Sequence, residues 1–413
     1  MPTEPTYLIV GASLTGAKAA ETLRSEGFGG PVILLGTETE RPYERPPLSK
    51  GYLLGKEDKS VIYVHEEGWY AEHGVDLRLG VTVTAVDRAG RTVTTADGES
   101  IGYDQLLLAT GASPRRLNIP GADREGVLYL RTVGDSERLA AAFQGGGRVV
   151  TVGAGWIGLE ATAAAREAGC EVTVVEPEPT ALYRAIGREL GDVFADLHRE
   201  HGVQFRFGES VSELRGPGTD GPVGEVITST GDALPADIVV VGIGVVPNTG
   251  LAVDAGLEVA NGVVTDAALR TSDPIICAAG DLANSHHPLL GRRARVEHWA
   301  NALNSGPAAA RSMLGQDVTY DPLPYFFSDQ YDLGMETAGL PEPGTYDQVV
   351  YRGDRAGREF IAFWLASGAV VAGMNVNVWD VSDDIQALIR SGKQVEPAGL
   401  TDPDVPLTDV CPS

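Results

Sequence analysis

Residues 148–176 read RVVTVGAGWIGLEATAAAREAGCEVTVVE, and their pattern indicates one complete supersecondary unit. The apolar run over 148–152 predicts a strand, and the Ala-rich segment that follows predicts a helix to about Ala168. A second apolar run, Val172–Val175, predicts another strand that ends at Glu176. Strand, glycine-rich turn, helix and strand in this order form a βαβ unit, the building block of a parallel sheet.

The turn in this unit has the spacing of a dinucleotide-binding loop. Gly153, Gly155 and Gly158 form the pattern G-x-G-x-x-G, and Glu176 follows Gly153 by 23 residues. Such a turn lets backbone N–H groups at the start of a helix approach a pyrophosphate. A carboxylate at the end of the second strand accepts hydrogen bonds from the ribose hydroxyls. The acid favours NAD, because a 2′-phosphate would need a cation at this place.

A second unit of the same kind opens the chain. Tyr7–Val10 predicts a strand, residues 11–16 read GASLTG, a helix is expected to about Ser25, and Val32–Leu35 predicts the next strand. Ser13 stands where the second glycine usually lies. Taken alone, this turn is open to two interpretations, a phosphate-binding loop or a plain βα turn.

Two further segments favour a dinucleotide at the first turn. Residues 106–112 read LLLATGA, and a strand expected from residue 271 onward ends in Gly280-Asp281. These segments resemble the ATG and GD motifs of flavoproteins that bind two dinucleotides, in which the GD aspartate binds the ribityl chain of the flavin. Glu38, 27 residues after Gly11, supplies the acid of the first unit.

The two glycine-rich turns begin 142 residues apart, which indicates a duplicated architecture and not a short-period repeat. After residue 320 come clustered aromatic residues, β-rich runs and a final helix over about 382–391. The predicted fold class is therefore α/β, with two Rossmann-like, glutathione-reductase-like dinucleotide-binding domains and a C-terminal α+β domain. The expected domains are a discontinuous FAD-binding domain (1–113 and 247–320), an NAD-binding domain (114–246) and the C-terminal domain (321–413).

Composition limits the classes of partner. The chain holds 57 Asp and Glu against 32 Lys and Arg, for a formal net charge of −25. Such a field repels nucleic acid and anionic membrane, and no apolar run approaches the ~20 residues that cross a bilayer, so neither partner is expected. The first residues lack the basic region of a signal peptide, and Cys170, Cys277 and Cys411 are far apart, so we expect a cytoplasmic protein.

Residues 41–50 (RPYERPPLSK) carry a family resemblance. They resemble the R-P-Y-x-R-P-P-L-S-K segment of the oxygenase-coupled, NADH-dependent ferredoxin reductases, a putidaredoxin reductase-like family in the FAD-dependent pyridine nucleotide-disulfide oxidoreductase superfamily. Residues 296–302 (VEHWANA) and 324–332 (PYFFSDQYD) are similar to two more signatures of that family. The resemblance runs from about Tyr7 to the end of the chain.

The resemblance implies FAD, bound tightly but without a covalent link, and NADH as the electron donor. Asp281 is expected to bind the ribityl chain, Arg131 to lie near the FAD pyrophosphate, and the helix that starts at Trp299 to direct its N-terminal amides at the flavin. Lys50 is expected beside the flavin and Glu160 on the nicotinamide side as the catalytic residues, with a purely structural pair as the alternative. The expected FAD site comprises Gly11, Ala12, Ser13, Leu14, Thr15, Gly16, Glu38, Arg45, Lys50, Val83, Ala109, Thr110, Gly111, Arg131, Gly280, Asp281, Glu297, His298 and Trp299. The expected NAD site comprises Gly153, Gly155, Trp156, Ile157, Gly158, Glu160, Glu176, Gly242, Ile243 and Gly244.

Cysteine placement indicates how electrons leave the flavin. The stretch 37–58, which follows the first βαβ unit, holds no cysteine, and Cys277 is expected to be a small buried residue of a strand. Direct transfer to an external carrier is therefore expected. No metal site is expected either, because the pairs His286-His287 and His198/His201 are interpreted as solvated surface.

Two positions depart from the family pattern. Phe327 stands where tryptophan is usual, and Gly334 where a basic residue is common. Both lie near the expected flavin face or electron exit, which leaves the partner preference open.

These features predict a ferredoxin–NAD⁺ reductase that passes electrons from NADH through FAD to a 2Fe–2S or similar ferredoxin serving a monooxygenase or dioxygenase. Two other classes stay open: a rubredoxin reductase or NADH oxidase on the same fold, and a redox-signalling flavoprotein of the apoptosis-inducing-factor type. Ferredoxins are usually acidic, so an acidic reductase needs a local basic docking patch. Its predicted members are Arg292, Arg293, Arg295 and Arg311, with an ordinary basic surface as the alternative.

The carboxylate of Glu176 makes the choice of nicotinamide cofactor testable. In an anaerobic titration of the holoenzyme, NADH is expected to bleach the visible flavin band at lower concentration than NADPH, because the 2′-phosphate of NADPH would face a carboxylate. Glu176→Arg is expected to bring the NADH and NADPH concentrations that bleach the flavin band closer together. Equal bleaching of the wild type by both nucleotides would contradict the assignment of Glu176.

Overall fold

Two five-stranded parallel sheets, each containing one of the βαβ units, organise the computed structural model, which describes residues 4–218 and 221–410. They confirm the two predicted Rossmann-like folds. The chain divides into two compact units. Unit 1 comprises Met1–Arg45, Lys59–Ser113 and Val246–Pro324, and unit 2 comprises Pro46–Asp58, Pro114–Val245 and Tyr325–Ser413. The domain boundaries expected from the sequence stay a prediction.

The parallel sheet of unit 1 has the strand order β19-β7-β1-β2-β3. Its strands are β1 (Tyr7–Val10), β2 (Val32–Gly36), β3 (Val75–Leu79), β7 (Gln105–Leu108) and β19 (Ile276–Ala278). All residues of β1 are buried, as expected for a parallel strand that is covered on both faces. The strand expected from residue 271 onward is thus shorter than predicted, because residues 271–275 form a turn in which the Thr271 hydroxyl and the Asp273 carboxylate bond to nearby backbone.

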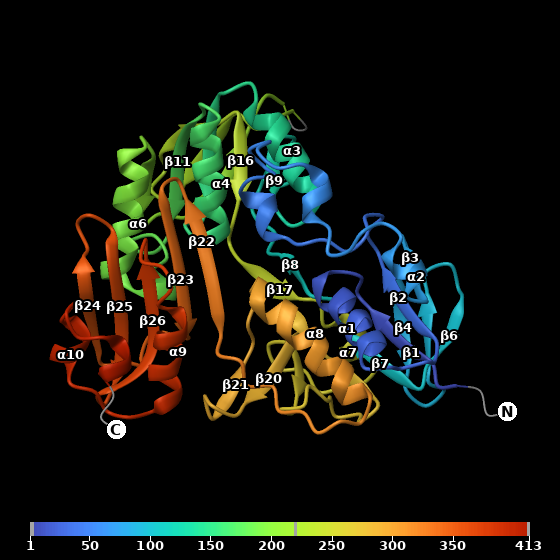
Figure 1. Ribbon diagram of the computed structural model, residues 1–413. Coiled ribbons are helices and arrows are strands. Elements are labelled where there is room, and N and C mark those ends of the chain that lie inside the picture. The colour runs from blue at the N-terminus through green and yellow to red at the C-terminus, as the bar shows by residue number, and fades with distance from the viewer. Residues whose placement is uncertain (1–3, 219–220, 411–413) are drawn as a thin grey trace. The chain divides into compact units, whose positions relative to one another are not determined.

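The side chains of β1 alternate between two cores. Ile9 belongs to the core beneath helices α1 (Leu14–Ser25) and α8 (Trp299–Met313), which lie side by side (Figure 1). Leu8 belongs to the opposite core, which includes residues of two small sheets. These sheets contain β4 (Val83–Asp87), β5 (Thr92–Thr95) and β6 (Ser100–Gly102), and β18 (Val263–Thr265), β20 (Ala283–His287) and β21 (Arg292–Ala294). The remaining helical segments of unit 1 are α2 (Trp69–Glu72), α7 (Gly250–Asp254), η2 (Lys59–Ile62) and η3 (Gly280–Leu282).

The parallel sheet of unit 2 has the order β12-β11-β10-β16-β9. Its strands are β9 (Val127–Tyr129), β10 (Arg148–Val152), β11 (Glu171–Glu176), β12 (Gln204–Phe207) and β16 (Ile238–Val241). The accompanying helices are η1 (Pro46–Ser49), α3 (Val133–Phe143), α4 (Trp156–Glu167), α5 (Tyr183–Ile186) and α6 (Arg188–Glu200), and a small antiparallel sheet holds β13 (Val211–Arg215), β14 (Glu225–Thr228) and β15 (Ala233–Pro235). The short strands β8 (Ala112–Pro114) and β17 (Val245–Pro247) lie where the chain passes from one unit to the other.

The C-terminal part of unit 2 is an antiparallel sheet of order β22-β23-β26-β25-β24. Its strands are β22 (Tyr325–Gln330), β23 (Leu333–Gly339), β24 (Gln348–Asp354), β25 (Glu359–Ala366) and β26 (Ala369–Val376), followed by α9 (Ser382–Ser391), α10 (Pro397–Thr401) and η4 (Leu407–Asp409). Phe194 of α6 and Trp364 of β25 belong to one buried core, so the antiparallel sheet packs against the helices of the parallel sheet. This confirms the predicted α+β character of the C-terminal region.

In each parallel sheet the order of the strands reverses at one strand. Strand β1 lies between β2 and β7, and β10 lies between β11 and β16. In open parallel sheets, ligands bind outside the carboxyl ends of the strands at such a reversal. Both glycine-rich turns follow strands at these points.

Among the helices of the described residues, none is long and apolar enough to span a bilayer.

Two of the expected surface histidines are buried, and the prediction for them was wrong. His198 is fully buried on the inner face of α6, where its ring bonds to Gln330 of β22. His287 lies in strand β20 and not in a loop, with its Nε2 2.9 Å from the carbonyl of Pro322. A histidine between charged neighbours in sequence can still face inward, because a helix turns each successive side chain by about 100°.

Candidate functional site

The first glycine-rich turn of unit 1 brings strand, turn and helix into backbone contact. Gly11 has φ +123°, a conformation that favours glycine, and a Cβ added there would lie 2.1 Å from the Ala109 carbonyl oxygen. A Cβ on Gly16 would lie 2.0 Å from the carbonyl oxygen of Gly11. The ATG segment predicted as part of the site therefore touches the first turn directly.

The turn of unit 2 repeats this geometry. Gly153 has φ +98°, and a Cβ there would lie 2.5 Å from the carbonyl oxygen of Gly242. A Cβ on Gly158 would lie 2.3 Å from the Gly153 carbonyl. At Gly155 the nearest atom to an added Cβ is the Gly242 oxygen at 3.9 Å, so a Cβ at the middle glycine would make only an ordinary van der Waals contact. The predicted segment 242–244 lies beside the turn, as the strand order requires.

Both helices that follow these turns begin in a way that suits an anion. The first turns of α1 and α4 are neutral, and within the described chain neither N-cap residue, Ser13 or Gly155, bonds to its helix through a side chain. The N-terminal amides and the positive end of the helix dipole therefore stay available. The residues present fit a pyrophosphate at each turn.

The two predicted ribose-binding acids differ in their contacts. Glu176, at the end of β11, accepts from the backbone N–H of Ala154 at 2.6 Å, which holds the carboxylate against the turn. Glu38 accepts from Arg45 Nη2 at 3.0 Å and from the Tyr43 hydroxyl at 2.5 Å. The structure thus brings Glu38 together with Arg45, another predicted FAD residue.

Helix α8 and the segment η3 complete the cluster in unit 1. Gly280 donates its N–H to Ser305 Oγ at 2.9 Å, and a Cβ on Gly280 would lie 2.6 Å from Thr15 Oγ1. The GD turn, α1 and α8 therefore meet at one place, with Asp281 following directly. Helix α8 begins at Trp299 as predicted, and His298 Nδ1 caps it by accepting from the N–H of residue 300.

Other predicted FAD residues are found in both units. Thr110 Oγ1 donates to the Asn248 carbonyl at 2.9 Å, and Val83 is a buried residue at the start of β4. Glu297 forms an ion pair with Arg295. Arg131 belongs to unit 2, where its backbone N–H donates to Asp135 Oδ2 at the start of α3.

A buried ion pair in unit 2 joins two predicted catalytic residues that are distant in sequence. Lys50 Nζ lies 2.8 Å from Glu160 Oε1, and the Glu160 side chain is only 3% exposed. Ser49 Oγ donates to Glu160 Oε2 at 2.5 Å, and Ser328 Oγ donates to Oε1 at 2.6 Å. A buried carboxylate without partners would be strongly unfavourable, and here three donors stabilise the charge of Glu160.

Sequence reasoning missed Ser49 and Ser328. Both lie inside segments that carry the family resemblance, residues 41–50 and 324–332, but a serine in a short segment gives no signal of a partner that lies 111 or 168 residues away. Only the packing of η1 and β22 against α4 reveals their role.

Phe327 and Gly334, the two positions that depart from the family pattern, each lie close to another side chain. The ring centroid of Phe327 lies 5.5 Å from Lys50 Nζ, within the range of a cation–π contact. A Cβ on Gly334 would lie 2.5 Å from Cη2 of Trp379, so the indole ring occupies the space of a side chain there. Trp379 is itself 54% exposed.

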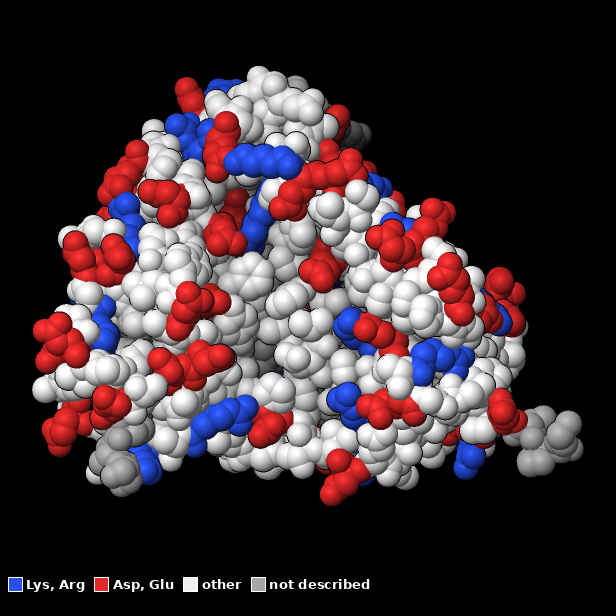
Figure 2. All heavy atoms as spheres, in the orientation of Figure 1, with Lys and Arg blue, Asp and Glu red and all other residues white. Residues whose placement is uncertain are grey.

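The four predicted docking arginines lie in unit 1, and each of them bonds within the chain; Arg292 Nη1 donates to the carbonyl of Arg293 at 3.4 Å. Arg293 Nη1 donates to the carbonyls of residues 265 and 284, Arg295 pairs with Glu297, and Arg311 Nε lies 2.8 Å from Glu26 Oε1. Arg292 lies on β21 beside Arg293. Figure 2 shows acidic side chains spread over the visible face with fewer basic ones among them. Docking at these arginines stays a prediction.

The described cysteines are unsuited to thiol chemistry. Cys170 and Cys277 are free and buried, and burial raises the pKa of the Cys277 thiol to about 12. A thiol with so high a pKa is a poor nucleophile at neutral pH. Among the described residues, no group of three or more His, Cys, Asp or Glu side chains is placed to hold a metal ion.

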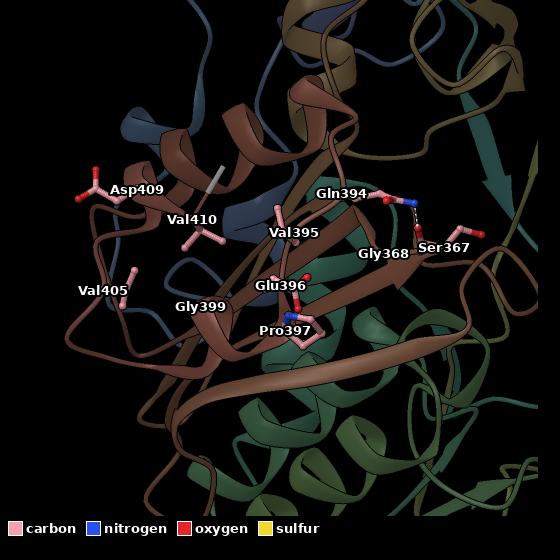
Figure 3. Close-up of a pocket in the computed structure, with 10 residues that line it drawn as sticks. All are labelled: Ser367, Gly368, Gln394, Val395, Glu396, Pro397, Gly399, Val405, Asp409 and Val410. Atoms are coloured by element: carbon pink, nitrogen blue, oxygen red, sulfur yellow. Dashed lines mark hydrogen bonds between the residues drawn. The ribbon is translucent and has the colours of Figure 1, made fainter. Parts of the chain in front are cut away.

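A pocket of about 730 Å³ lies in the C-terminal part of unit 2 (Figure 3). It is bounded by the turn between β25 and β26 and by the segment after α9, where Gln394 donates to the Ser367 carbonyl. Its lining residues are Ser367, Gly368, Gln394, Val395, Glu396, Pro397, Gly399, Val405, Asp409 and Val410. It shares no residue with the predicted sites.

Two glycine turns at two sheet reversals, with an acid at the end of each second strand, define a protein class that binds two dinucleotides. The family model described as pyridine nucleotide-disulphide oxidoreductase matches residues 5–306, and the model described as reductase C-terminal matches residues 325–411. The chain belongs to the pyridine nucleotide-disulphide oxidoreductase family. Membership implies FAD and NAD(H) as cofactors.

Named relatives cover almost the whole chain. The ferredoxin–NAD(+) reductase component of the anthranilate 1,2-dioxygenase system of Burkholderia cepacia is 40% identical over 97% of this chain and 98% of its own length. A ferredoxin–NAD(P)(+) reductase of Sphingomonas is 39% identical over 97% and 96%. Among solved structures, the covalent putidaredoxin reductase–putidaredoxin complex matches with a TM-score of 0.94 and 35% identity, covering 99% of this chain and 98% of the other.

The buried pair predicts a large loss of stability when its acid is removed. Glu160→Ala leaves the Lys50 ammonium and two hydroxyl groups without their acceptor, and is expected to lower the free energy of unfolding of unit 2 by ~3 kcal/mol. The matched control is Glu167→Ala on the same helix, whose ion pair with Lys56 is largely exposed and is expected to contribute below ~1 kcal/mol. Chemical denaturation measures both, and equal losses would contradict the burial argument.

Proposed function

We propose that this protein is a ferredoxin–NAD⁺ reductase that passes electrons from NADH through FAD to a 2Fe–2S or similar ferredoxin serving a monooxygenase or dioxygenase. The observation that carries the proposal is the pair of glycine turns at the two sheet reversals, one in each unit. The relatives support the choice of electron acceptor, because one is the ferredoxin–NAD(+) reductase component of a dioxygenase system and another is a putidaredoxin reductase in complex with putidaredoxin.

In this proposal the turn of unit 1 binds FAD, tightly and without a covalent link, and the turn of unit 2 binds NADH. Each turn binds a pyrophosphate through helix N-terminal amides, and Glu38 and Glu176 accept ribose hydroxyls. Bound FAD would supply hydride acceptance and one-electron release, and the residues of the chain would hold and orient it. Lys50 and Glu160 are the proposed catalytic residues. The Lys50 ammonium and the Glu160 carboxylate stabilise each other's charge through their ion pair.

The acceptor in the proposal is an external one-electron carrier. Because Cys170 and Cys277 are both buried, neither suits an internal disulfide relay. The proposal takes the ferredoxin to be acidic, with Arg292, Arg293, Arg295 and Arg311 bordering its docking face. It also places the reaction in the cytoplasm, in keeping with two free thiols.

The function is tested by making reduction of cytochrome c depend on an added ferredoxin. With FAD-loaded protein and NADH, cytochrome c reduction is expected to be slow alone and to rise at least ~10-fold with a cognate 2Fe–2S ferredoxin, because hydride oxidation and one-electron delivery are then coupled. Rubredoxin in place of the ferredoxin separates the two carriers. Rapid NADH oxidation by oxygen, with no response to either carrier, would contradict the proposal and favour an oxidase.

A further inference from the structure

A line of buried polar side chains runs through unit 2 from helix α6 to Glu160. His198 Nε2 lies 2.8 Å from Gln330 Oε1, Gln330 Nε2 donates to Ser328 Oγ at 3.1 Å, and Ser328 Oγ donates to Glu160 Oε1 at 2.6 Å. At the other end, the Tyr331 hydroxyl lies 3.3 Å from His198 Nδ1. Each of the four residues from His198 to Glu160 is at most 4% exposed.

The donors in this line can be ordered by elementary chemistry. Burial lowers the pKa of His198 to about 4, so its ring is neutral near pH 7 and carries one proton. Burial raises the pKa of Tyr331, so its hydroxyl keeps a proton to donate to Nδ1. The ring proton is therefore on Nε2 and is donated to Gln330, whose amide then has its oxygen toward His198 and its nitrogen toward Ser328.

The order continues to the carboxylate. Because Ser328 Oγ accepts from Gln330, its single proton is directed at Glu160. Ser49 and Lys50 donate to the same carboxylate. Every bond in the line thus points toward Glu160, and reversing any one of them would leave two donors or two acceptors facing each other in a buried place.

We propose that His198 is a positioning residue for Glu160, acting through Gln330 and Ser328 to hold the carboxylate as an acceptor beside Lys50. The inference rests on the proposed function, in which Glu160 takes part in the reaction with NADH. His198 is not a catalytic residue in this account, since it touches neither Glu160 nor Lys50.

Other charged groups face the two ends of the line without belonging to it. His201, the C-cap residue of α6, interacts electrostatically with His198, and its ring stacks on Tyr331 at 3.6 Å. Arg166 and Glu167 of α4 interact with Tyr331. At the Glu160 end, Asp329 of β22 interacts electrostatically with both Lys50 and Glu160, and Glu336 of β23 interacts in turn with Asp329.

The first experiment determines the tautomer of His198 and needs no turnover. In nitrogen-15 NMR spectra of histidine-labelled holoenzyme, the His198 ring, assigned by its loss in His198→Gln, is expected to carry its proton on Nε2 and to stay neutral from about pH 8 to 5.5, since its pKa is about 4. A proton on Nδ1, or protonation near pH 6.5, overturns the proposal. This result stands whether or not a ferredoxin is the electron acceptor.

The second experiment is a double-mutant cycle read as the anaerobic rate of flavin reduction by NADH. His198→Phe and Ser328→Ala are each expected to slow it by roughly 3- to 10-fold, the size of one lost hydrogen bond, and the double variant is expected to be no slower than Ser328→Ala alone. Additive losses, or no effect of His198→Phe, overturn the proposal. Because only the NADH half-reaction is measured, a failure of ferredoxin reduction would contradict the proposed function and leave this result standing.

Two variants control for general damage. His201→Phe keeps an aromatic ring against Tyr331 and lies outside the line, so the rate is expected to stay at the wild-type value. His198→Gln keeps an N–H donor and is expected to restore most of the rate lost in His198→Phe. If His198→Phe does not fold, the proposal is tested by the rate of flavin reduction in His198→Gln and by the tautomer of His198 in the wild type. A His198→Gln rate below that of Ser328→Ala, or a proton on Nδ1 of His198, overturns the proposal.

Discussion

The contact on which both halves of this structure depend is the approach of a helix N-terminus to the backbone of its own preceding strand. A Cβ on Gly16 would lie 2.0 Å from the Gly11 carbonyl, and one on Gly158 would lie 2.3 Å from the Gly153 carbonyl. Any side chain at these positions would push the helix off the sheet. With glycine there, the first-turn amides lie at the carboxyl edge of the sheet, where a parallel fold can bind a ligand.

The same constraint explains why residues far apart in sequence share a site. Strand order places the end of β7 beside the end of β1, and the end of β16 beside the end of β10. The turn at Ala109 therefore touches Gly11, and the turn at Gly242 touches Gly153. Both units therefore use the same contact between turn and strand end, with Ser13 in the first turn at the position that Gly155 has in the second.

Local patterns were sufficient to predict this framework. Helix α1 ends at Ser25 as expected, and β10, α4 and β11 lie within a residue or two of their predicted bounds. These elements are read from periodicity and glycine spacing, which are properties of neighbouring residues. The strand before Gly280 was predicted too long because side-chain bonds of Thr271 and Asp273 form a turn that apolar periodicity does not reveal.

The surroundings of Glu160 could not be predicted in the same way. His198 looked like a surface residue between charged neighbours, yet it is buried against a strand that begins 127 residues later in the chain. Its contacts exist because the antiparallel sheet packs on α4 and α6, and that packing is a tertiary property. Likewise, the arginines of 292–311 looked like one basic patch, while their contacts in the fold divide them among several internal partners.

Calorimetric titration of Gly155→Asp with NAD⁺ tests whether the chain binds two dinucleotides, one at each turn. A Cβ at Gly155 would make only an ordinary van der Waals contact, with the Gly242 carbonyl oxygen at 3.9 Å, so the variant is expected to fold and to retain one FAD per chain, as the wild type does. Its carboxylate would face the pyrophosphate, so NAD⁺ binding, one per wild-type chain, is expected to be lost. Unchanged NAD⁺ binding, or loss of FAD together with NAD⁺, would contradict the assignment of one dinucleotide to each turn.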